Sequence, residues 1–507
     1  MTSETSPTAK IAWLPDLLYA GGRFESGVAL VCDASGEIVR LSRAAELADE
    51  KRIRLSGRAL MPGMINAHSH AFQRVLRGRT EHRTTLNGEA GGDSFWTWRE
   101  KMYSAATRLT PEDIYDASRM AFLEMALSGI AAVGEFHYLH RGPDGTPYDD
   151  PNLLAKEVVR AARDLGLRIA LLRVAYARSG FQTDPNPQQA RFIEENPETY
   201  LRNLNMLISD LDRGPSPTVR EGSSRHDLRT LPNGRANAPV ASAWVGIAPH
   251  SVRAVPLDYA REIIGYAKRL DLKVHMHVAE QPAEVSACVA EYGRTPVALL
   301  ETEGFLSEKF TAVHAIHITP KAIPAFARTG AIVCACPTTE RNLGDGVVPV
   351  DEYFKQDVPI CLGTDSHAQI DLLEDARELE YHLRLQRLER SVLESQDSSL
   401  KSQVTKPGSL ASSLFDCATA NGARSIGAPG GALEPGRPAD FFTVDLNDPS
   451  IAGASSDDLL SSIVFSLSRA AVREVVVGGK PIVSDGRHLI QEDVIEKFNE
   501  LQKRLWS

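Results

Sequence analysis

The stretch of sequence that decides the fold is residues 59–70, ALMPGMINAHSH, a short apolar run that ends in two histidines. Short apolar runs that alternate with helical segments are typical of a parallel sheet built from βα units. Seven further runs follow, each before a segment able to form a helix: IAAVGEFHY (130–138), LRIALLRVAYA (167–177), WVGIAPHS (244–251), KVHMHVAE (273–280), FTAVHAIH (310–317), AIVCACP (331–337) and PICLGTDSH (359–367). Eight such units predict an α/β fold, the (β/α)8 or TIM barrel.

The segments between these runs carry helix signals. Thr110-Pro111-Glu112-Asp113 offers an N-capping hydroxyl, a proline at the first helical position and an acidic first turn. We expect this helix to end before Gly129. Its apolar residues recur at helical spacing and are predicted to pack on the barrel: Ile114, Ala117, Ala121, Phe122 and Met125.

The two ends of the chain have a different pattern. Short strand-like runs broken by Gly and Pro occur at both ends, such as LLYAGGRF (17–24) and VREVVVGGKPIVSDG (472–486). We therefore expect one small β domain formed by both termini, residues 1–60 and 428–507, around a barrel at 61–427. Two polar stretches, 213–243 and 390–409, predict surface insertions or mobile loops.

Composition disfavours several classes of protein. The 507 residues contain 56 Lys and Arg against 66 Asp and Glu, a formal net charge of −10, so a nucleic-acid partner is not expected. The six cysteines form no CxxC pair, which indicates a reducing compartment. The sequence has neither a run of 18 apolar residues nor a basic segment followed by an apolar core at its start, so we expect a cytoplasmic protein without a membrane partner.

Histidines gather where an active site is expected. Barrel active sites lie at the C-terminal ends of the strands. Residues i and i+2 of a strand point the same way, so His68 and His70 can hold one ion, as can His275 and His277. Imidazole nitrogens with one carboxylate, for which Asp365 in the last strand is the natural candidate, suit one divalent metal, Zn²⁺ or, as a second choice, Fe²⁺.

The order of these motifs resembles the amidohydrolase superfamily, whose metal-dependent barrels carry HxH after the first strand, His after the fifth and sixth, and Asp after the eighth. The resemblance implies four metal ligands: His68, His70, His277 and Asp365. Members with two metals have a lysine after the fourth strand. This chain has APHS (248–251) there, which implies a single metal.

The fifth-strand motif HVAE (277–280) resembles the branch of the superfamily that hydrolyses C=N bonds and releases ammonia, with Glu280 as proton shuttle. A closer resemblance, over nearly the whole chain, is to the formimidoylglutamate deiminases of histidine degradation. It rests on HAFQR (70–74), DSFWTWRE (93–100), GIAPHSVR (246–253) and AEQ (279–281). DSFWTWRE discriminates best, because a barrel does not itself require two tryptophans and an arginine in the loop after its first strand.

This resemblance implies hydrolysis of N-formimidoyl-L-glutamate, a formamidine with two carboxylates on its tail. Asp365 would take a proton from the attacking water, His314 would orient that water, and Glu280 would pass a proton to the departing nitrogen. Guanidinium groups bind carboxylates well because both are planar and can pair through two hydrogen bonds. The implied substrate contacts are Gln73, Arg99, Tyr138, His250 and Arg253.

Two alternative functions stay open. Another deaminase of the same branch, acting on guanine, a purine nucleoside or a triazine, would favour aromatic and amide contacts over paired arginines. A non-catalytic scaffold barrel would have lost metal ligands, and none is lost here. We expect His275 to be structural and His317 and His367 to pack or to support the site. Because relatives of this kind commonly dimerise, a homodimer is expected.

Overall fold

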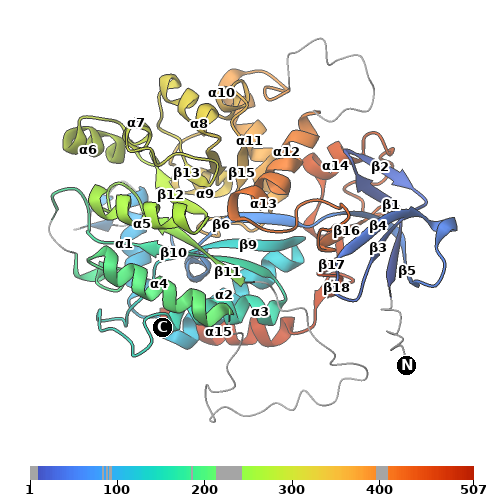
Figure 1. Cartoon of the computed structure of the whole chain (residues 1–507), viewed down its shortest axis with the longest axis horizontal. Coiled ribbons are helices and arrows are strands. Elements are labelled where there is room, and N and C mark those ends of the chain that lie inside the picture. Colours follow the sequence, from blue (N-terminus) through green and yellow to red (C-terminus); the bar gives the residue numbers. More distant parts are fainter. Residues whose placement is uncertain are drawn as a thin grey trace, which may run out of the picture.

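The computed structural model describes residues 10–82, 85–86, 89–90, 94–183, 186–212, 243–394 and 409–507. The two expected insertions, 213–243 and 390–409, lie mostly outside these residues. In the described part, a barrel ringed by helices stands beside a separate β-sheet (Figure 1).

The barrel wall contains all the expected strands: β6 (Met64–Ser69), β9 (Ile130–His137), β10 (Arg168–Ala175), β11 (Ala243–Pro249), β12 (Val274–Val278), β13 (Phe310–His314), β14 (Ile332–Ala335) and β15 (Ile360–Leu362). Neighbours are parallel, in the order β15-β14-β13-β12-β11-β10-β9-β6. The two end strands meet at a bridge between Ser69 and Asp365. There the Asp365 amide donates to the His68 carbonyl and the His70 amide donates to the Asp365 carbonyl, both at 3.1 Å. The barrel therefore closes at the candidate metal ligands, and the fold prediction is confirmed.

Helix α2 (Pro111–Leu127) begins and ends where the sequence predicts. The Thr110 hydroxyl accepts a hydrogen bond from the Asp113 amide at 3.2 Å. Gly129 follows the helix with a φ of +86°, and a β-carbon there would lie 2.9 Å from the Phe442 ring, so only glycine fits. The predicted apolar face is fully buried: Ile114, Ala117, Ala121, Phe122 and Met125.

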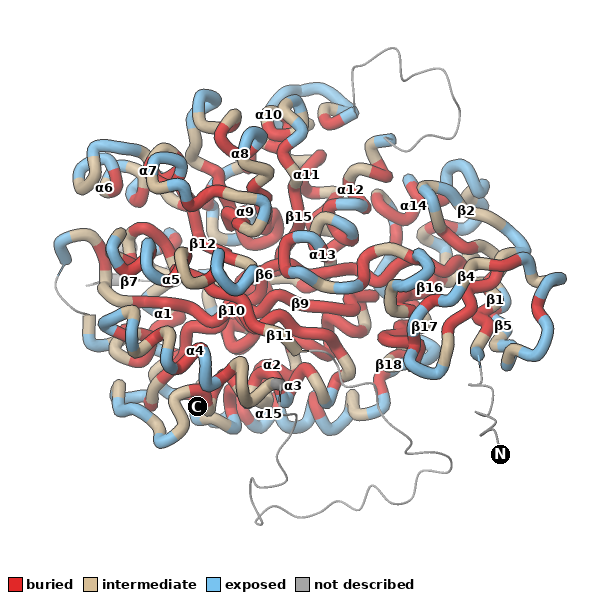
Figure 2. Tube along the Cα trace, viewed as in Figure 1, coloured by how far each residue is buried: buried red, intermediate tan, exposed pale blue. Residues whose placement is uncertain are grey.

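The other helices mostly cover the outside of the barrel, and Figure 2 shows the buried residues concentrated in the strands that they surround. They are α1 (Phe95–Ala106), α3 (Leu153–Leu165), α4 (Pro197–Asp212), α5 (Leu257–Arg269), α6 (Pro282–Tyr292), α7 (Pro296–Thr302), α8 (Ile323–Thr329), α9 (Pro337–Leu343), α10 (Val350–Phe354), α11 (Leu372–Arg387), α12 (Leu410–Ala418), α13 (Ala420–Ile426) and α14 (Leu459–Ser466). A short hairpin is formed by β7 (Thr85–Leu86) and β8 (Glu89–Ala90).

Both ends of the chain build the second sheet, as expected. The N-terminal strands are β1 (Ile11–Ala20), β2 (Arg23–Ser26), β3 (Val28–Cys32), β4 (Ile38–Arg43) and β5 (Lys51–Pro62). The C-terminal strands are β16 (Phe441–Asp445), β17 (Val472–Val477), β18 (Lys480–Ser484) and β19 (Arg487–His488). The two groups join where β16 pairs antiparallel with β5.

The last helix, α15 (Gln491–Trp506), returns to the barrel and lies against α2 (Figure 1). Ion pairs join Arg504 to Asp113 and Asp493 to Arg119. The Trp506 indole also donates a hydrogen bond to the Val75 carbonyl at 3.3 Å. The end of the chain therefore braces the barrel as well as completing the small sheet.

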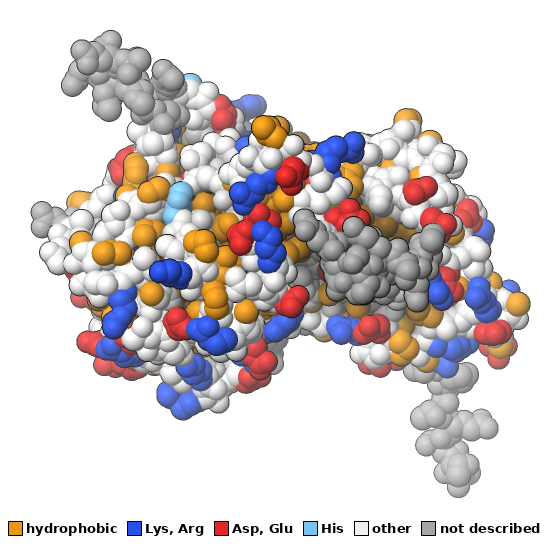
Figure 3. All heavy atoms as spheres, turned by 90° about the horizontal axis from the view of Figure 1, so that it is seen from above, with side chains coloured by type: hydrophobic (Ala, Val, Ile, Leu, Met, Phe, Trp, Pro, Cys, Tyr) orange, Lys and Arg blue, Asp and Glu red, His pale blue; other side chains and the backbone are white. Residues whose placement is uncertain are grey.

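On the face shown in Figure 3, Lys and Arg side chains are interspersed with Asp and Glu. No helix in the described part of the chain combines the length and the apolar character needed to span a membrane.

Candidate active site

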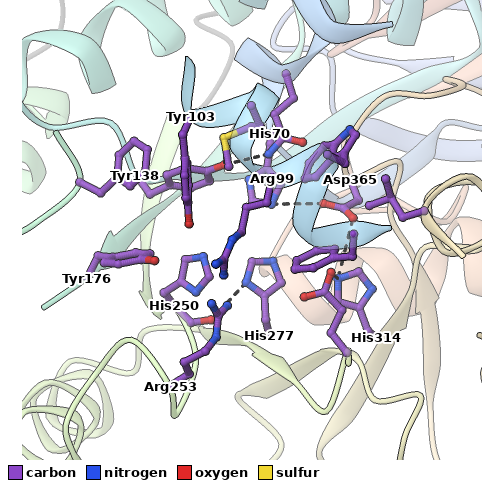
Figure 4. Close-up of a pocket in the computed structure, with 17 residues that line it drawn as sticks. His70, Arg99, Tyr103, Tyr138, Tyr176, His250, Arg253, His277, His314 and Asp365 are labelled. Atoms are coloured by element: carbon purple, nitrogen blue, oxygen red, sulfur yellow. Dashed lines mark hydrogen bonds and ion pairs between the residues drawn. The ribbon is translucent and has the colours of Figure 1, made fainter. Parts of the chain in front are cut away.

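A pocket with an empty volume of about 510 Å³, part of it open to solvent, lies at the C-terminal ends of the barrel strands (Figure 4). His277, His314 and Asp365 lie toward one side of it, and Tyr138 and Tyr176 toward the other. Two arginine side chains extend between these groups. The pocket therefore combines possible metal ligands with cationic side chains.

Three imidazoles and one carboxylate converge in the wall of this pocket. The Nε2 atoms of His68 and His70 lie 3.4 and 3.2 Å from Oδ1 of Asp365. The Nε2 atoms of His277 and His68 are 3.2 Å apart. All four residues are buried, and their ligand atoms lie within 4.8 Å of one another. The structure thus brings together the four residues that the resemblance implied as ligands.

The hydrogen bonds of the imidazoles direct their Nε2 atoms at one point. Nδ1 of His70 lies 2.9 Å from the Phe136 carbonyl, and Nδ1 of His277 lies 3.2 Å from the His250 carbonyl. Each Nδ1 therefore donates a proton to a carbonyl, which turns the Nε2 atom on the other side of the ring toward the cluster. Burial lowers the pKa of His68 to about 4 and that of His277 well below its usual value, so both are neutral at pH 7. Neutral imidazoles with one carboxylate fit a divalent transition metal.

The backbone is strained where the strands deliver these side chains. Ala279, His314, Asp365 and His367 have φ values of +51°, +69°, +42° and +60°, in the left-handed region. Each such residue costs on the order of 1–3 kcal/mol, and such strain clusters at functional sites. Ala279 directly follows β12 and His314 ends β13, whereas Asp365 and His367 lie three and five residues after the end of β15.

His314 lies among carboxylates. Its Nδ1 is 3.2 Å from Oε1 of Glu340, and its Nε2 is 3.7 Å from Oε1 of Glu280 and 3.8 Å from Oδ2 of Asp365. Burial opposes its charge, but the negative charges of Glu280, Asp365 and Glu340 raise its pKa to about 10. Burial raises the pKa of Glu280, so this carboxyl is suited to hold and donate a proton.

One supporting residue, Glu135 in β9, was not predicted from the sequence. Its carboxylate accepts hydrogen bonds from the Ser69 hydroxyl and from the Ala71 amide, the latter at 2.8 Å. Because Ser69 stands between His68 and His70, Glu135 holds the segment that carries two of the converging imidazoles. A glutamate inside the otherwise apolar run IAAVGEFHY was a signal that could have identified it.

Two guanidinium groups line the same pocket. Arg99 comes from α1, and Arg253 from the segment after β11. Nε and Nη1 of Arg99 and Nε of Arg253 are buried and have no hydrogen-bond partner among the described residues. Arg99 also lies over the Trp96 ring, 4.4 Å from its centroid, which orients it. Unpaired buried N–H groups cost free energy, so these atoms indicate an anionic ligand.

The other implied substrate contacts also line this pocket. Nε2 of Gln73 donates to the Tyr138 hydroxyl at 2.7 Å, which leaves Oε1 of Gln73 buried without a partner in the described structure. Burial lowers the pKa of His250 well below its usual value, so its imidazole is neutral. The implied contacts therefore share one cavity: Gln73, Arg99, Tyr138, His250 and Arg253.

Sequence reasoning missed three further residues. Nε2 of Gln189 donates to the hydroxyls of Tyr103 and Tyr176, at 2.6 and 2.9 Å, and both tyrosines line the pocket. Tyr103 follows Arg99 by four residues on α1, a helical spacing that could have identified it. Gln189 ends a short 3-10 helix, Pro187–Gln189, and no motif marks it.

The segment DSFWTWRE does not form the expected loop over its described part. Helix α1 begins at Phe95, and the Ser94 amide donates to the Thr97 hydroxyl at 2.9 Å. Polar groups of this kind at a first helical turn favour helix initiation. The expectation of a loop rested on the two tryptophans and did not use this signal. Asp93 lies outside the described residues.

The three histidines that were expected to be structural or to support the site each have a hydrogen-bond partner. Nε2 of His275 lies 3.2 Å from the Ser425 carbonyl, and His275 is not among the grouped ligands. Nε2 of His317 lies 2.7 Å from the Asp345 carbonyl. Nε2 of His367 lies 3.1 Å from the Ser69 hydroxyl, so His367 supports the segment that Glu135 also holds.

A (β/α)8 barrel with three imidazoles and a carboxylate at the C-terminal ends of its strands defines the class of metal-dependent barrel hydrolases. A sequence model described as the amidohydrolase family matches residues 59–482. The chain belongs to the amidohydrolase family, whose members generally bind a divalent metal.

Individual relatives refine this placement. The chain is 35% identical to the formimidoylglutamate deiminase of Pseudomonas aeruginosa over 97% of each chain. It is 26% identical to a 5-methylthioadenosine/S-adenosylhomocysteine deaminase of Pyrococcus abyssi over 92% of each. Among solved structures, an amidohydrolase from Brucella melitensis matches with a TM-score of 0.82 and 31% identity, over 98% of this chain and 100% of the other. The resemblance derived from the motifs is thereby confirmed.

Proposed function

We propose that this protein hydrolyses N-formimidoyl-L-glutamate to N-formyl-L-glutamate and ammonia, as a step of histidine degradation. The observation that carries the proposal is the pair Arg99 and Arg253, whose unpaired buried N–H groups line the same pocket as the His and Asp cluster. The identity of 35% to a formimidoylglutamate deiminase over nearly the full length supports it.

The tail of this substrate carries two carboxylates, which match two guanidinium groups. The formamidine group carries N–H donors, and the partnerless Oε1 of Gln73 is an acceptor for one of them. Because the net charge of the chain is −10, attraction to the whole protein does not concentrate an anionic substrate, so Arg99 and Arg253 supply the local attraction. A neutral purine would leave the same guanidinium N–H groups unpaired, so this alternative fits less well.

We assign the proton transfers to Asp365 and Glu280, and the orientation of the water to His314. A metal held by His68, His70, His277 and Asp365 would lower the pKa of a water to about 7. Asp365 accepts the proton of the attacking water. His314, with Nε2 at 3.8 Å from Oδ2 of Asp365, orients the water and stabilises the tetrahedral intermediate, which forms as the water oxygen bonds to carbon and the C=N bond becomes a single bond. Glu280 then protonates the nitrogen. The C–N bond breaks, ammonia leaves, and the hydroxyl group gives up its proton as the formyl C=O forms.

We further propose one Zn²⁺ per chain, with Fe²⁺ as the alternative, and a homodimer in the cytoplasm with neither nucleic acid nor membrane as a partner. The donor set supports the metal, and the acidic net charge argues against nucleic acid. We propose residues 61–427 as the barrel domain and residues 1–60 with 428–507 as the small domain. Light scattering of the purified protein measures the oligomeric state.

The direct test is ammonia release with N-formimidoyl-L-glutamate, guanine and adenosine assayed side by side, and with metal content measured on the same sample. Release only from the first substrate, with N-formyl-L-glutamate in equal amount, is the expected result. Release from a purine would overturn the roles of Arg99 and Arg253 but keep the metal chemistry. A metal-loaded protein inactive on all substrates would favour a non-catalytic scaffold.

A further inference from the structure

A second group of possible metal ligands lies beside the first. Cys336 directly follows β14, whose neighbours are β13, which ends in His314, and β15, after which Asp365 comes. The ligand atoms of His314, Cys336 and Asp365 lie within 4.8 Å of one another, and all three residues are buried. The thiol of Cys336 takes no part in the reaction proposed above.

Two distances from Nε2 of His314 match one tetrahedral ion. Ligand bonds of about 2.0–2.3 Å in a tetrahedral zinc site separate the ligand atoms by about 3.3–3.8 Å. Nε2 of His314 lies 3.8 Å from Oδ2 of Asp365 and 3.7 Å from Oε1 of Glu280, a possible fourth ligand. Nδ1 of His314 is held by Glu340 at 3.2 Å, which directs Nε2 toward this position.

The two groups use different atoms of the residue they share. Oδ1 of Asp365 faces His68 and His70, whereas Oδ2 faces His314. A carboxylate in this position can bridge two ions, and paired ions in two-metal sites are about 3.5–4 Å apart. The group of His314, Cys336 and Asp365 lies on the β13–β14–β15 side of the barrel. Its ligands do not include a lysine after the fourth strand.

We propose that His314, Cys336 and Asp365 form a second metal site, selective for thiophilic ions such as Cd²⁺ or excess Zn²⁺, whose occupation inhibits the enzyme. A thiolate ligand selects soft ions, and when the ion binds, the Cys336 thiol and Nε2 of the protonated His314 each release a proton to solvent. Inhibition follows because the ion occupies His314 and Asp365, which handle the water. This part rests on the proposed function, whereas the binding site itself does not.

The binding test uses the holoenzyme that already contains its first metal. Cd²⁺ is titrated while bound equivalents are measured by equilibrium dialysis and elemental analysis, and the thiolate-to-cadmium charge-transfer band is followed by ultraviolet absorption. We expect one additional equivalent with this band in the wild type, and neither in C336S or C336A. C417S is the matched control, because Cys417 is also a free, buried cysteine but lies on α12 and belongs to neither group of possible ligands. It should retain both signals.

The first equivalent of metal and the thermal unfolding midpoint report whether each variant is folded. Absence of the band in the wild type overturns the site whatever the variants do. Persistence of the second equivalent in a folded C336S or C336A overturns the role of Cys336. In the activity assay, C336S should need at least tenfold more free Zn²⁺ for half inhibition, and an unchanged midpoint overturns the inhibitory role. If N-formimidoyl-L-glutamate is not hydrolysed at all, the proposed function fails while the cadmium titration still decides the site.

Discussion

Replacing Arg253 by methionine removes a guanidinium from the pocket and keeps an unbranched side chain. Nε of Arg253 has no partner within the described structure, so the variant loses no hydrogen bond from that atom. A hydrogen bond from a charged group to a substrate carboxylate contributes about 1.5–3 kcal/mol. Since about 1.4 kcal/mol is a factor of ten, KM for N-formimidoyl-L-glutamate should rise by about 10- to 150-fold. Because the tail does not react, kcat should change by less than about threefold.

The assay is steady-state release of ammonia, with metal content measured on the same preparations. Arg261→Met is the matched control, because it makes the same change in charge at an exposed ion pair with Glu303. Its KM should stay within about twofold of the wild type. A KM for Arg253→Met within twofold of the wild type, or a fall in kcat at constant KM, would refute the assignment of Arg253 to the substrate tail.

Three further predictions test other parts of the structure. His277→Ala should lose the metal, because this variant lacks one of the three converging Nε2 atoms. If elemental analysis of the variant still finds one ion per chain, His277 is excluded as a ligand. Glu280→Gln should keep its metal but lose about 10²–10⁴-fold in kcat, and loss of metal instead would point to a ligand role. Burial raises the pKa of Glu194, but the positive charge of Arg173, which donates hydrogen bonds to this carboxylate at 2.5 and 2.9 Å, outweighs burial and lowers the pKa to about 2 from its ordinary 4.5. The ionised form of Glu194 therefore stabilises the fold by about 3 kcal/mol, a contribution that is fully present above pH 4.5 and is lost as the pH falls toward 2. The difference in unfolding free energy between wild type and Glu194→Gln, measured in urea, should shrink over that range. A difference that stays constant with pH would contradict this role of Glu194.

The sequence by itself determined the fold class and predicted which side chains converge at the site. Alternating apolar runs and helical segments reflect backbone geometry over a few residues, which is why the eight barrel strands and the ends of α2 were predicted correctly. The spacing of His68 and His70 places both side chains on one face of a strand by the same local geometry. The last strand offered Asp365 as the carboxylate, and the resemblance then selected His277. The structure brings both to the same point.

Only the tertiary structure decided how distant residues meet. His275 and His277 have the same spacing as His68 and His70, yet His275 contacts the Ser425 carbonyl and only His277 reaches the cluster. The meeting of Asp365 with the first strand depends on closure of the whole barrel. Glu135 and Gln189 gain their roles from partners on other elements. Local periodicity cannot specify such contacts, because they depend on how all the strands and helices pack together.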